Sequence, residues 1–273
     1  MSVPTIDLAD LAKHACIIAR AAGEAILQVY RSDFAVEQKL DRSPLTEADL
    51  AAHHIIVNAL RVLTPELPIL SEESASLPWS ERSSWTRYWL VDPLDGTREF
   101  VKRNGEFTVN IALIDAHETV LGVVYAPVLD EMYFAWAGSD KKGGAFAQHA
   151  DDSEPQQLHT RSRPQTLIVA GSRSHADVRQ QATLQKIGAH ELQALGSSLK
   201  FCRIAEGKAD LYLRHGPTSE WDTAAAQCVL EQAGGGVCQF DGAPLRYNRG
   251  ESLLNPEFFA FGDRSVRWQD FLR

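Results

Sequence analysis

The chain has 273 residues, 44% of them hydrophobic and 23% charged, which is the composition of a globular protein and not of a disordered or fibrous one. Its net charge of -9 disfavours a general nucleic-acid-binding surface, because binding to a phosphate backbone requires a positive field. The four cysteines have no CxxC spacing, so we expect neither a disulfide framework nor a zinc site. No apolar stretch approaches roughly 18 residues, so we expect no transmembrane helix.

The first half of the chain is expected to begin with two helices. Apolar residues recur at three- and four-residue steps over residues 8–29, which is the period of an amphipathic helix. The sequence TEAD at 46–49 offers an N-cap and an acid three residues on, and predicts a second helix over 46–65. We expect both helices to precede a hairpin-rich sheet, indicated by the short apolar runs 68–71, 88–91, 108–114, 120–125, 131–136 and 143–147.

A polar stretch at 149–165 interrupts this pattern and is the expected boundary between two subdomains. The N-terminal α+β subdomain would cover residues 1–150 and the C-terminal α/β subdomain residues 151–273. Beyond the boundary, the strand-like segments LIVAGS (167–172) and ADLYLR (209–214) alternate with helix-like segments, which predicts an α/β layer arrangement. The polar loop 77–87 is expected to be mobile.

Acidic residues stand where predicted strands end or helices begin. Glu72 follows the strand-like PILS, Asp92 and Asp95 lie in DPLDGT, and Asp222 lies at the head of a helix. In DPLDGT, proline fixes one backbone dihedral and glycine permits a sharp turn, so the two aspartates can face the same side. Such a cluster suits a hard cation such as Mg²⁺, since carboxylates gathered without one would repel each other.

Each of these acids also has a purely structural interpretation. Asp49, in the first turn of the second helix, and Asp222 can serve as helix caps or dipole partners. The DPLDGT segment can be a simple β-turn. Single residues therefore leave the choice between structure and function open.

The combination of segments narrows the choice. In this order, DRSPLTEAD (41–49), SEES (71–74), DPLDGT (92–97) and WDTAA (221–225) resemble the signatures of the inositol monophosphatase-like, lithium-sensitive phosphatase superfamily. The segments SPLTEAD, GSRSH (171–175) and GSSLKFCRIAEGKADLYLR (196–214) further resemble its CysQ branch, the 3′(2′),5′-bisphosphate nucleotidases. The resemblance implies a layered αβαβα sandwich with the active site between two subdomains.

The resemblance also implies two Mg²⁺ ions. Asp92 would bridge them, Glu72 would hold one together with the main-chain carbonyl of Leu94, and Asp95 and Asp222 would hold the other. A third, weaker Mg²⁺ near Glu72 is left open.

By the same resemblance, Asp49 and Thr97 orient and deprotonate a metal-bound water, and Glu72 can assist as a base. The cation lowers the pKa of that water, so hydroxide becomes available near neutral pH. The backbone N–H groups of Gly96 and Thr97 would receive the phosphate if they begin a helix, because a helix N-terminus is an anion site.

Substrate selectivity must come from the second half of the chain, since an inositol phosphate and a nucleotide present the same phosphate monoester. A bisphosphorylated nucleotide needs additional cationic and hydroxyl donors and a flat apolar surface. The structural alternative for Lys200 is a solvated helix residue, and for His175 it is a helix cap. Glu220 either meets the sugar or faces water. The candidates, besides Asp222 at the metal site, are Arg173, Ser174, His175, Ser197, Ser198, Lys200 and Arg214.

The function expected from this resemblance is Mg²⁺-dependent hydrolysis of adenosine 3′,5′-bisphosphate to AMP and phosphate, with PAPS as a second substrate, in support of sulfate assimilation. Lithium should inhibit it. The alternatives are an inositol-1-monophosphatase or related sugar-phosphate phosphatase, and a catalytically silent nucleotide-binding regulator. We expect a cytoplasmic location, with peripheral contact to the inner membrane and the choice between monomer and homodimer left open.

Overall fold

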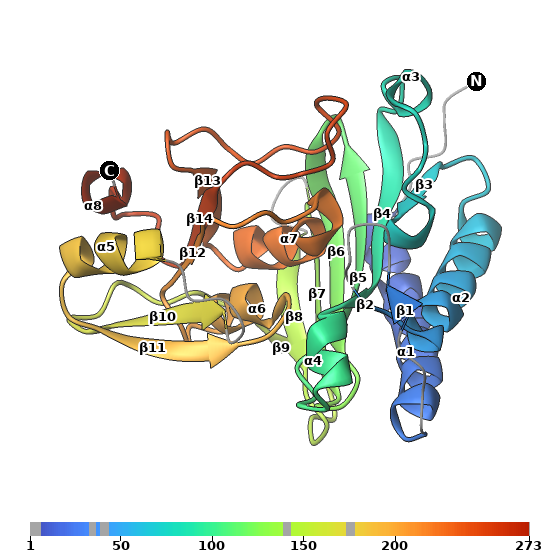
Figure 1. Cartoon of the computed structure of the whole chain (residues 1–273), viewed down its shortest axis with the longest axis horizontal. Helices are drawn as coiled ribbons and strands as arrows, with labels where there is room; N and C mark the ends of the chain where they lie inside the picture. Colours follow the sequence, from blue (N-terminus) through green and yellow to red (C-terminus); the bar gives the residue numbers. More distant parts are fainter. Residues whose placement is uncertain (1–6, 33–36, 39–43, 139–142, 173–177, 273) are drawn as a thin grey trace.

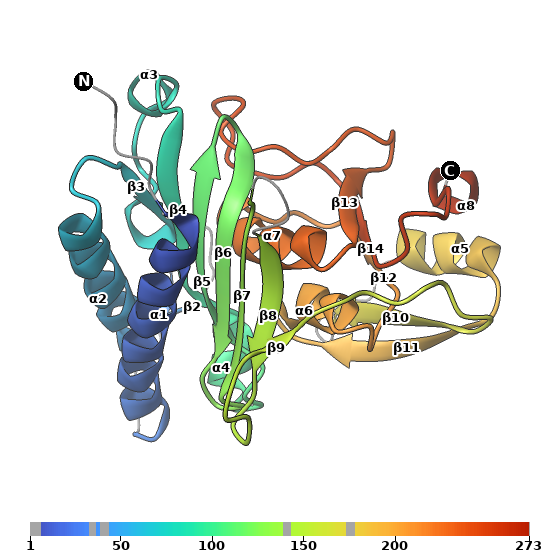
Figure 2. The ribbon, with the colours of Figure 1, turned by 180° about the vertical axis from the view of Figure 1, so that it is seen from behind.

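The computed structural model describes residues 7–32, 37–38, 44–138, 143–172 and 178–272. Two sheets and three helical layers alternate in a five-layered α/β/α/β/α sandwich, which confirms the expected fold class (Figures 1 and 2). Among these residues no helix is both long and apolar enough to cross a membrane. The outer helices on one side are α1 (Leu8–Tyr30) and α2 (Glu47–Leu63), the central ones are α6 (Leu199–Ala205) and α7 (Ala224–Gln232), and those on the far side are α5 (Val178–Ile187) and α8 (Gln269–Leu272).

The first sheet is the hairpin-rich sheet that the sequence predicts. Its order is β3-β4-β5-β6-β7-β8-β9, and every neighbouring pair is antiparallel except the parallel pair β3–β4. Its last strand, β9, lies inside the polar stretch 149–165 that is the expected boundary, so the sheet extends beyond residue 150. The strands are β3 (Ile69–Ser71), β4 (Arg87–Asp95), β5 (Thr108–Asp115), β6 (Glu118–Ala126), β7 (Glu131–Trp136), β8 (Gly144–Gln148) and β9 (Gln156–Gln157).

The second sheet has five strands in the order β11-β10-β12-β14-β13. Strand β10 is parallel to both its neighbours, whereas β14 is antiparallel to β12 and β13. The sequence indicated β10 and β12 but missed β11, β13 and β14. The strands are β10 (Leu167–Ser172), β11 (His190–Leu195), β12 (Leu211–Arg214), β13 (Gly236–Gln239) and β14 (Phe258–Phe261).

Helix α7 fills the layer between the sheets at very close range. An added Cβ at Gly122 in β6 would lie 2.2 Å from the carbonyl oxygen of Ala225, so only glycine admits the helix here. Buried side chains of α6 and α7 form one hydrophobic cluster with both sheets. This packing brings the start of α7 against the strands that carry the acidic residues.

One expectation for the first half is wrong, and one segment has more structure than its sequence indicated. A short antiparallel pair, β1 (Glu37–Gln38) and β2 (Pro44–Leu45), stands between the two long helices, so the helices do not both precede the first strands. The segment 77–87 contains a helix, α3 (Trp79–Arg82), whose last residue is only 1% exposed. Its hydrogen-bonded, buried arginine anchors a segment whose polar sequence suggested a mobile loop.

Candidate active site

The end of β4 places two aspartates beside the start of a helix. A β-bulge inserts one residue between Asp92, which pairs with Asn110, and Asp95, which pairs with Thr108. Residues three apart face opposite sides of a regular strand, so the bulge allows both carboxylates to approach one point. Gly96 follows with φ +92°, a conformation that favours glycine, and caps helix α4 (Thr97–Val101).

Four carboxylates from three separate segments meet at this point. Glu72 begins the 3₁₀ helix η1 (Glu72–Ser74), and Asp222 ends the 3₁₀ helix η3 (Glu220–Asp222). Burial, followed by repulsion from Glu72, Asp95 and Asp222, raises the pKa of Asp92 well above its usual range. Burial and the charges of Asp95 and Glu72 raise the pKa of Asp222 in the same way. The site therefore gathers three partly buried carboxylates around the buried Asp92.

The donor chemistry of this cluster fits a hard divalent cation. Its side-chain donors are carboxylate oxygens, and the Leu94 carbonyl oxygen lies 3.4 Å from the Thr97 hydroxyl. Within the described residues, no group of three or more His, Cys, Asp or Glu side chains is arranged so that it could hold a metal ion. Mg²⁺ suits such a site, because it keeps several waters and binds through one or two carboxylates together with substrate phosphate.

Asp49 serves as a helix cap and also lies within reach of the cluster. Its Oδ2 accepts hydrogen bonds from the backbone N–H (2.8 Å) and the hydroxyl (2.7 Å) of Thr46, forming the predicted capping box. Its Oδ1 accepts a bond from the Thr97 hydroxyl at 3.3 Å. The structural and functional interpretations of Asp49 are thus compatible.

Ser198 and Asn110 form a hydrogen-bond network with Asp95. The Ser198 hydroxyl lies 2.8 Å from Asp95 Oδ2 and 3.0 Å from the Asp222 carbonyl oxygen. Asn110 donates to Ser198 at 2.9 Å and lies 3.4 Å from Asp95 Oδ2. Ser198 is thus bonded to the acidic cluster itself. Sequence reasoning missed Asn110, although one amide within the otherwise apolar run TVNIALI was a usable signal.

Lys200 lies inside the protein, so its interpretation as a solvated helix residue is wrong. Its Nζ donates to the carbonyls of Ser197 at 2.6 Å and Leu195 at 3.4 Å, and lies 5.3 Å from the ring centre of Tyr212. Burial lowers the pKa of Lys200 to about 8, against the opposing attraction of Asp95.

Ser197 follows β11 and Arg214 ends β12, and both strands belong to the second sheet. Ser197 has φ +41°, and its buried hydroxyl has no hydrogen-bond partner within the described structure. The charge of Arg214 influences Lys200 and Asp222, and its guanidinium donates to the carbonyls of Gly216 (3.1 Å) and Pro217 (2.7 Å). Arg173, Ser174 and His175 fall outside the described residues.

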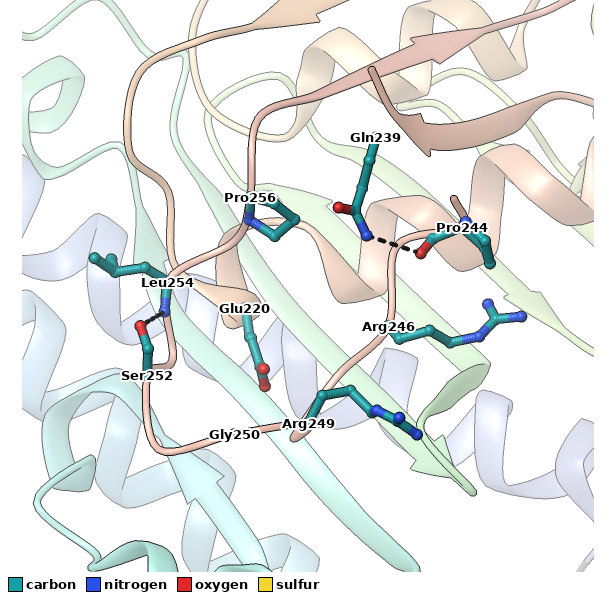
Figure 3. A pocket seen from close by; sticks show the side chains of 9 residues that line it. All are labelled: Glu220, Gln239, Pro244, Arg246, Arg249, Gly250, Ser252, Leu254 and Pro256. Atoms are coloured by element: carbon teal, nitrogen blue, oxygen red, sulfur yellow. Dashed lines mark hydrogen bonds between the residues drawn. The ribbon is translucent and has the colours of Figure 1, made fainter. Parts of the chain in front are cut away.

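Glu220 points away from water, so its water-facing alternative is wrong. It is 4% exposed, and both its carboxylate oxygens accept the backbone N–H of Asn248, at 2.8 and 2.9 Å. Burial raises the pKa of Glu220 to about 7, against the opposing hydrogen bond from Asn248. Figure 3 shows its side chain among residues of the 244–256 loop, which line a pocket of about 500 Å³.

Comparisons with known proteins agree over most of the chain. The profile of the inositol monophosphatase family matches residues 7–262. The 3′(2′),5′-bisphosphate nucleotidase CysQ of Escherichia coli strain K12 is 51% identical over 245 residues, which cover 89% of this chain and 96% of that protein. The CysQ of Haemophilus influenzae is 37% identical over 260 residues, or 94% of each protein.

Solved structures extend this agreement to three dimensions. The crystal structure of CysQ from Bacteroides thetaiotaomicron has a TM-score of 0.81 and 39% identity, covering 93% of this chain and 98% of that one. The suhB protein of Bartonella henselae shares the fold at 22% identity, with a TM-score of 0.76 over 97% of this chain and 98% of its own. The chain therefore belongs to the inositol monophosphatase family.

Proposed function

We propose that this chain is a Mg²⁺-dependent 3′(2′),5′-bisphosphate nucleotidase, a phosphoric monoester hydrolase that converts adenosine 3′,5′-bisphosphate to AMP and phosphate. The relatives named as this nucleotidase, 51% identical over most of the chain, support the activity. Members of the inositol monophosphatase family are metal-dependent phosphatases, generally with Mg²⁺. The structural observation that carries the proposal is the approach of the partly buried Glu72, Asp95 and Asp222 to the buried Asp92, beside Thr97.

The cation ligands in this proposal are the four carboxylates of the cluster and the Leu94 carbonyl. Asp92 is their centre, because the charges of the other three all act on it. We assign two Mg²⁺ to this set. When bound, the ions lower the pKa of a water molecule and neutralise the charge that develops on the transferred phosphoryl group.

Thr97 and Asp49 orient the attacking water. The Thr97 hydroxyl donates its only proton to Asp49, so its oxygen lone pairs are free to accept a hydrogen bond from water. Asp49 is held in place by its two hydrogen bonds from Thr46. Its negative charge favours transfer of the Thr97 hydroxyl proton toward it. Glu72 assists as a second base. The N–H groups of Gly96 and Thr97 hold the phosphate at the beginning of α4.

The second phosphate of the nucleotide is assigned to the second half of the chain. Lys200 and Arg214 supply positive charge close to the acidic cluster, and the Ser197 hydroxyl is available as a donor. Ser198 takes part by fixing Asp95 and Asp222. Arg173, Ser174 and His175 remain predicted substrate contacts, and PAPS remains a predicted second substrate. The free state of all four cysteines supports the proposed cytoplasmic location.

The test is phosphate release from adenosine 3′,5′-bisphosphate and inositol 1-phosphate side by side, with Mg²⁺ and with EDTA. We expect kcat/KM to favour the nucleotide by about a hundredfold or more, which corresponds to roughly 2.7 kcal/mol of differential transition-state binding. The opposite preference would retain the metal site but refute the nucleotide subsite and favour an inositol phosphatase. Nucleotide binding without any phosphate release would favour the silent regulator.

A further inference from the structure

Arg82 ties the first half of the chain to the second from inside the protein. The side chain is 1% exposed and stacks over the Trp79 ring, with 4.9 Å between the guanidinium carbon and the ring centre. Its guanidinium donates to Asn248 Oδ1 at 2.7 Å, to the Gly250 carbonyl at 3.0 Å and to the Glu251 carbonyl. The bonds span more than 160 positions of sequence, so one buried cation holds the 248–251 turn against α3.

Asn248 passes this connection on to η3. Its side-chain Nδ2 donates back to the Arg82 carbonyl at 2.7 Å, so both ends of the amide are bonded to the same arginine. Its backbone N–H donates to both carboxylate oxygens of Glu220 at 2.8 and 2.9 Å. All three residues are at least 95% buried. Arg82, Asn248 and Glu220 form one continuous polar network, here called the Arg82 network.

Each end of the Arg82 network is close along the chain to a part of the acidic cluster. Helix α3 lies between η1, which begins with Glu72, and β4, which carries Asp92. Glu220 and Asp222 belong to the same single turn, η3. In Figure 1 the loop that follows β13 reaches toward α3, and Figure 3 places Glu220 among that loop's residues. A shift of the network would therefore move Asp222 relative to Glu72 and Asp92.

We propose that Arg82 is a positioning residue for the cation site, and that through Asn248 and Glu220 it fixes the distance of Asp222 from Glu72 and Asp92. This inference rests on the proposed function, because it concerns the same carboxylates. Groups that orient the ligands of a metal typically change metal affinity 10- to 100-fold when they are removed. If the network merely stabilised the fold, removing Arg82 would lower the unfolding free energy and leave cation affinity unchanged.

The experiment measures cation binding directly in the full-length protein. Mn²⁺, detected by electron paramagnetic resonance, and Mg²⁺, followed by calorimetry, are titrated into wild type and Arg82→Met. We expect the dissociation constant of the variant to rise about 10-fold or more. The Mg²⁺ concentration for half-maximal phosphate release should rise in parallel, whereas kcat at saturating Mg²⁺ recovers most of its wild-type value. Arg82→Lys, which keeps the charge and part of the bonding, should fall between them.

Two further variants separate positioning from loss of stability. Asn248→Gly breaks only the side-chain bonds to Arg82, and glycine suits the φ of +51° at this position, so this variant is the milder disruption. Arg161→Met is the matched control. It removes an arginine with two bonds to the buried Asp210 at 2.8 and 2.7 Å, between segments that carry none of the four carboxylates.

The outcomes distinguish this inference from the proposed function. Weaker cation binding in Arg82→Met and Asn248→Gly, but not in Arg161→Met at a similar loss of stability, supports positioning. Equal cation affinity in all the variants would overturn it. Should Arg82→Met fail to fold, Asn248→Gly decides alone. Wild-type protein that binds no divalent cation and releases no phosphate would instead refute the proposed function.

Discussion

Replacing Lys200 by methionine should make the protein more stable and less active toward the nucleotide. Methionine retains most of the length and apolar surface of the lysine stem but removes its charge. The ammonium is buried beside two carbonyls and the Tyr212 ring, in a position proposed to meet the second phosphate. The ammonium of Lys200 therefore favours substrate binding but lowers the stability of the folded protein, because burying a charge costs free energy.

The size of the effect follows from the pKa of Lys200. Burial lowers it from 10.5 to about 8, and at 1.36 kcal/mol per pKa unit the charged form costs the free protein about 3 kcal/mol at pH 7. Removing the ammonium also leaves the carbonyls of Ser197 and Leu195 without this donor, at about 1 kcal/mol each. The expected net gain is about 1 kcal/mol of unfolding free energy, or roughly 2–4 °C in Tm.

The pH dependence of this gain has a defined sign. The folded-state pKa of Lys200 lies below its unfolded-state value, so the wild-type cost is fully present below about pH 8 and disappears as the pH rises toward 10.5. The stability advantage of Lys200→Met should therefore shrink between neutral and alkaline pH. Loss of one charge-assisted contact to phosphate should lower kcat/KM for adenosine 3′,5′-bisphosphate about 10- to 100-fold.

Urea unfolding at neutral and alkaline pH, combined with kcat/KM for both phosphate substrates, tests this reasoning. Lys208→Met is the control, because the Lys208 side chain is 57% exposed and its ion pair with Glu206 is expected to contribute little. A Lys200→Met protein that is less stable than wild type at neutral pH would refute the charge-burial argument. An unchanged preference between the two substrates would remove Lys200 from the proposed subsite.

Three other outcomes are expected. Thr97→Val should lower kcat about 100- to 10,000-fold with little change in KM, because it removes the hydroxyl that links water to Asp49. Thr97→Ser should retain activity, and equal rates for both variants would contradict this role. Asp92→Asn should abolish turnover without lowering the unfolding free energy, since it relieves repulsion from three neighbouring carboxylates. An active variant would exclude Asp92 as the bridging ligand. EDTA should abolish phosphate release, and added Mg²⁺ should restore it. Activity that persists unchanged at tens of millimolar Li⁺ would count against the proposed site.

The sequence alone was sufficient for features that depend on near neighbours. The amphipathic period determined α1, and the Thr46–Asp49 spacing determined the capping box at the start of α2. The glycine in DPLDGT determined the turn into α4. In each case the interacting residues lie within a few positions of one another, so the local pattern contains the physical cause.

Tertiary structure alone decided how those features combine. Ser198 meets Asp95 across 103 positions, and Arg82 meets Asn248 across 166, so neither contact leaves a signal in local periodicity. The same polar sequence that suggested a mobile loop at 77–87 contains a fully buried arginine, because the 248–251 turn covers it. Whether a charged side chain faces water or the interior depends on what packs over it, and for Lys200 and Arg82 the covering groups come from distant parts of the chain.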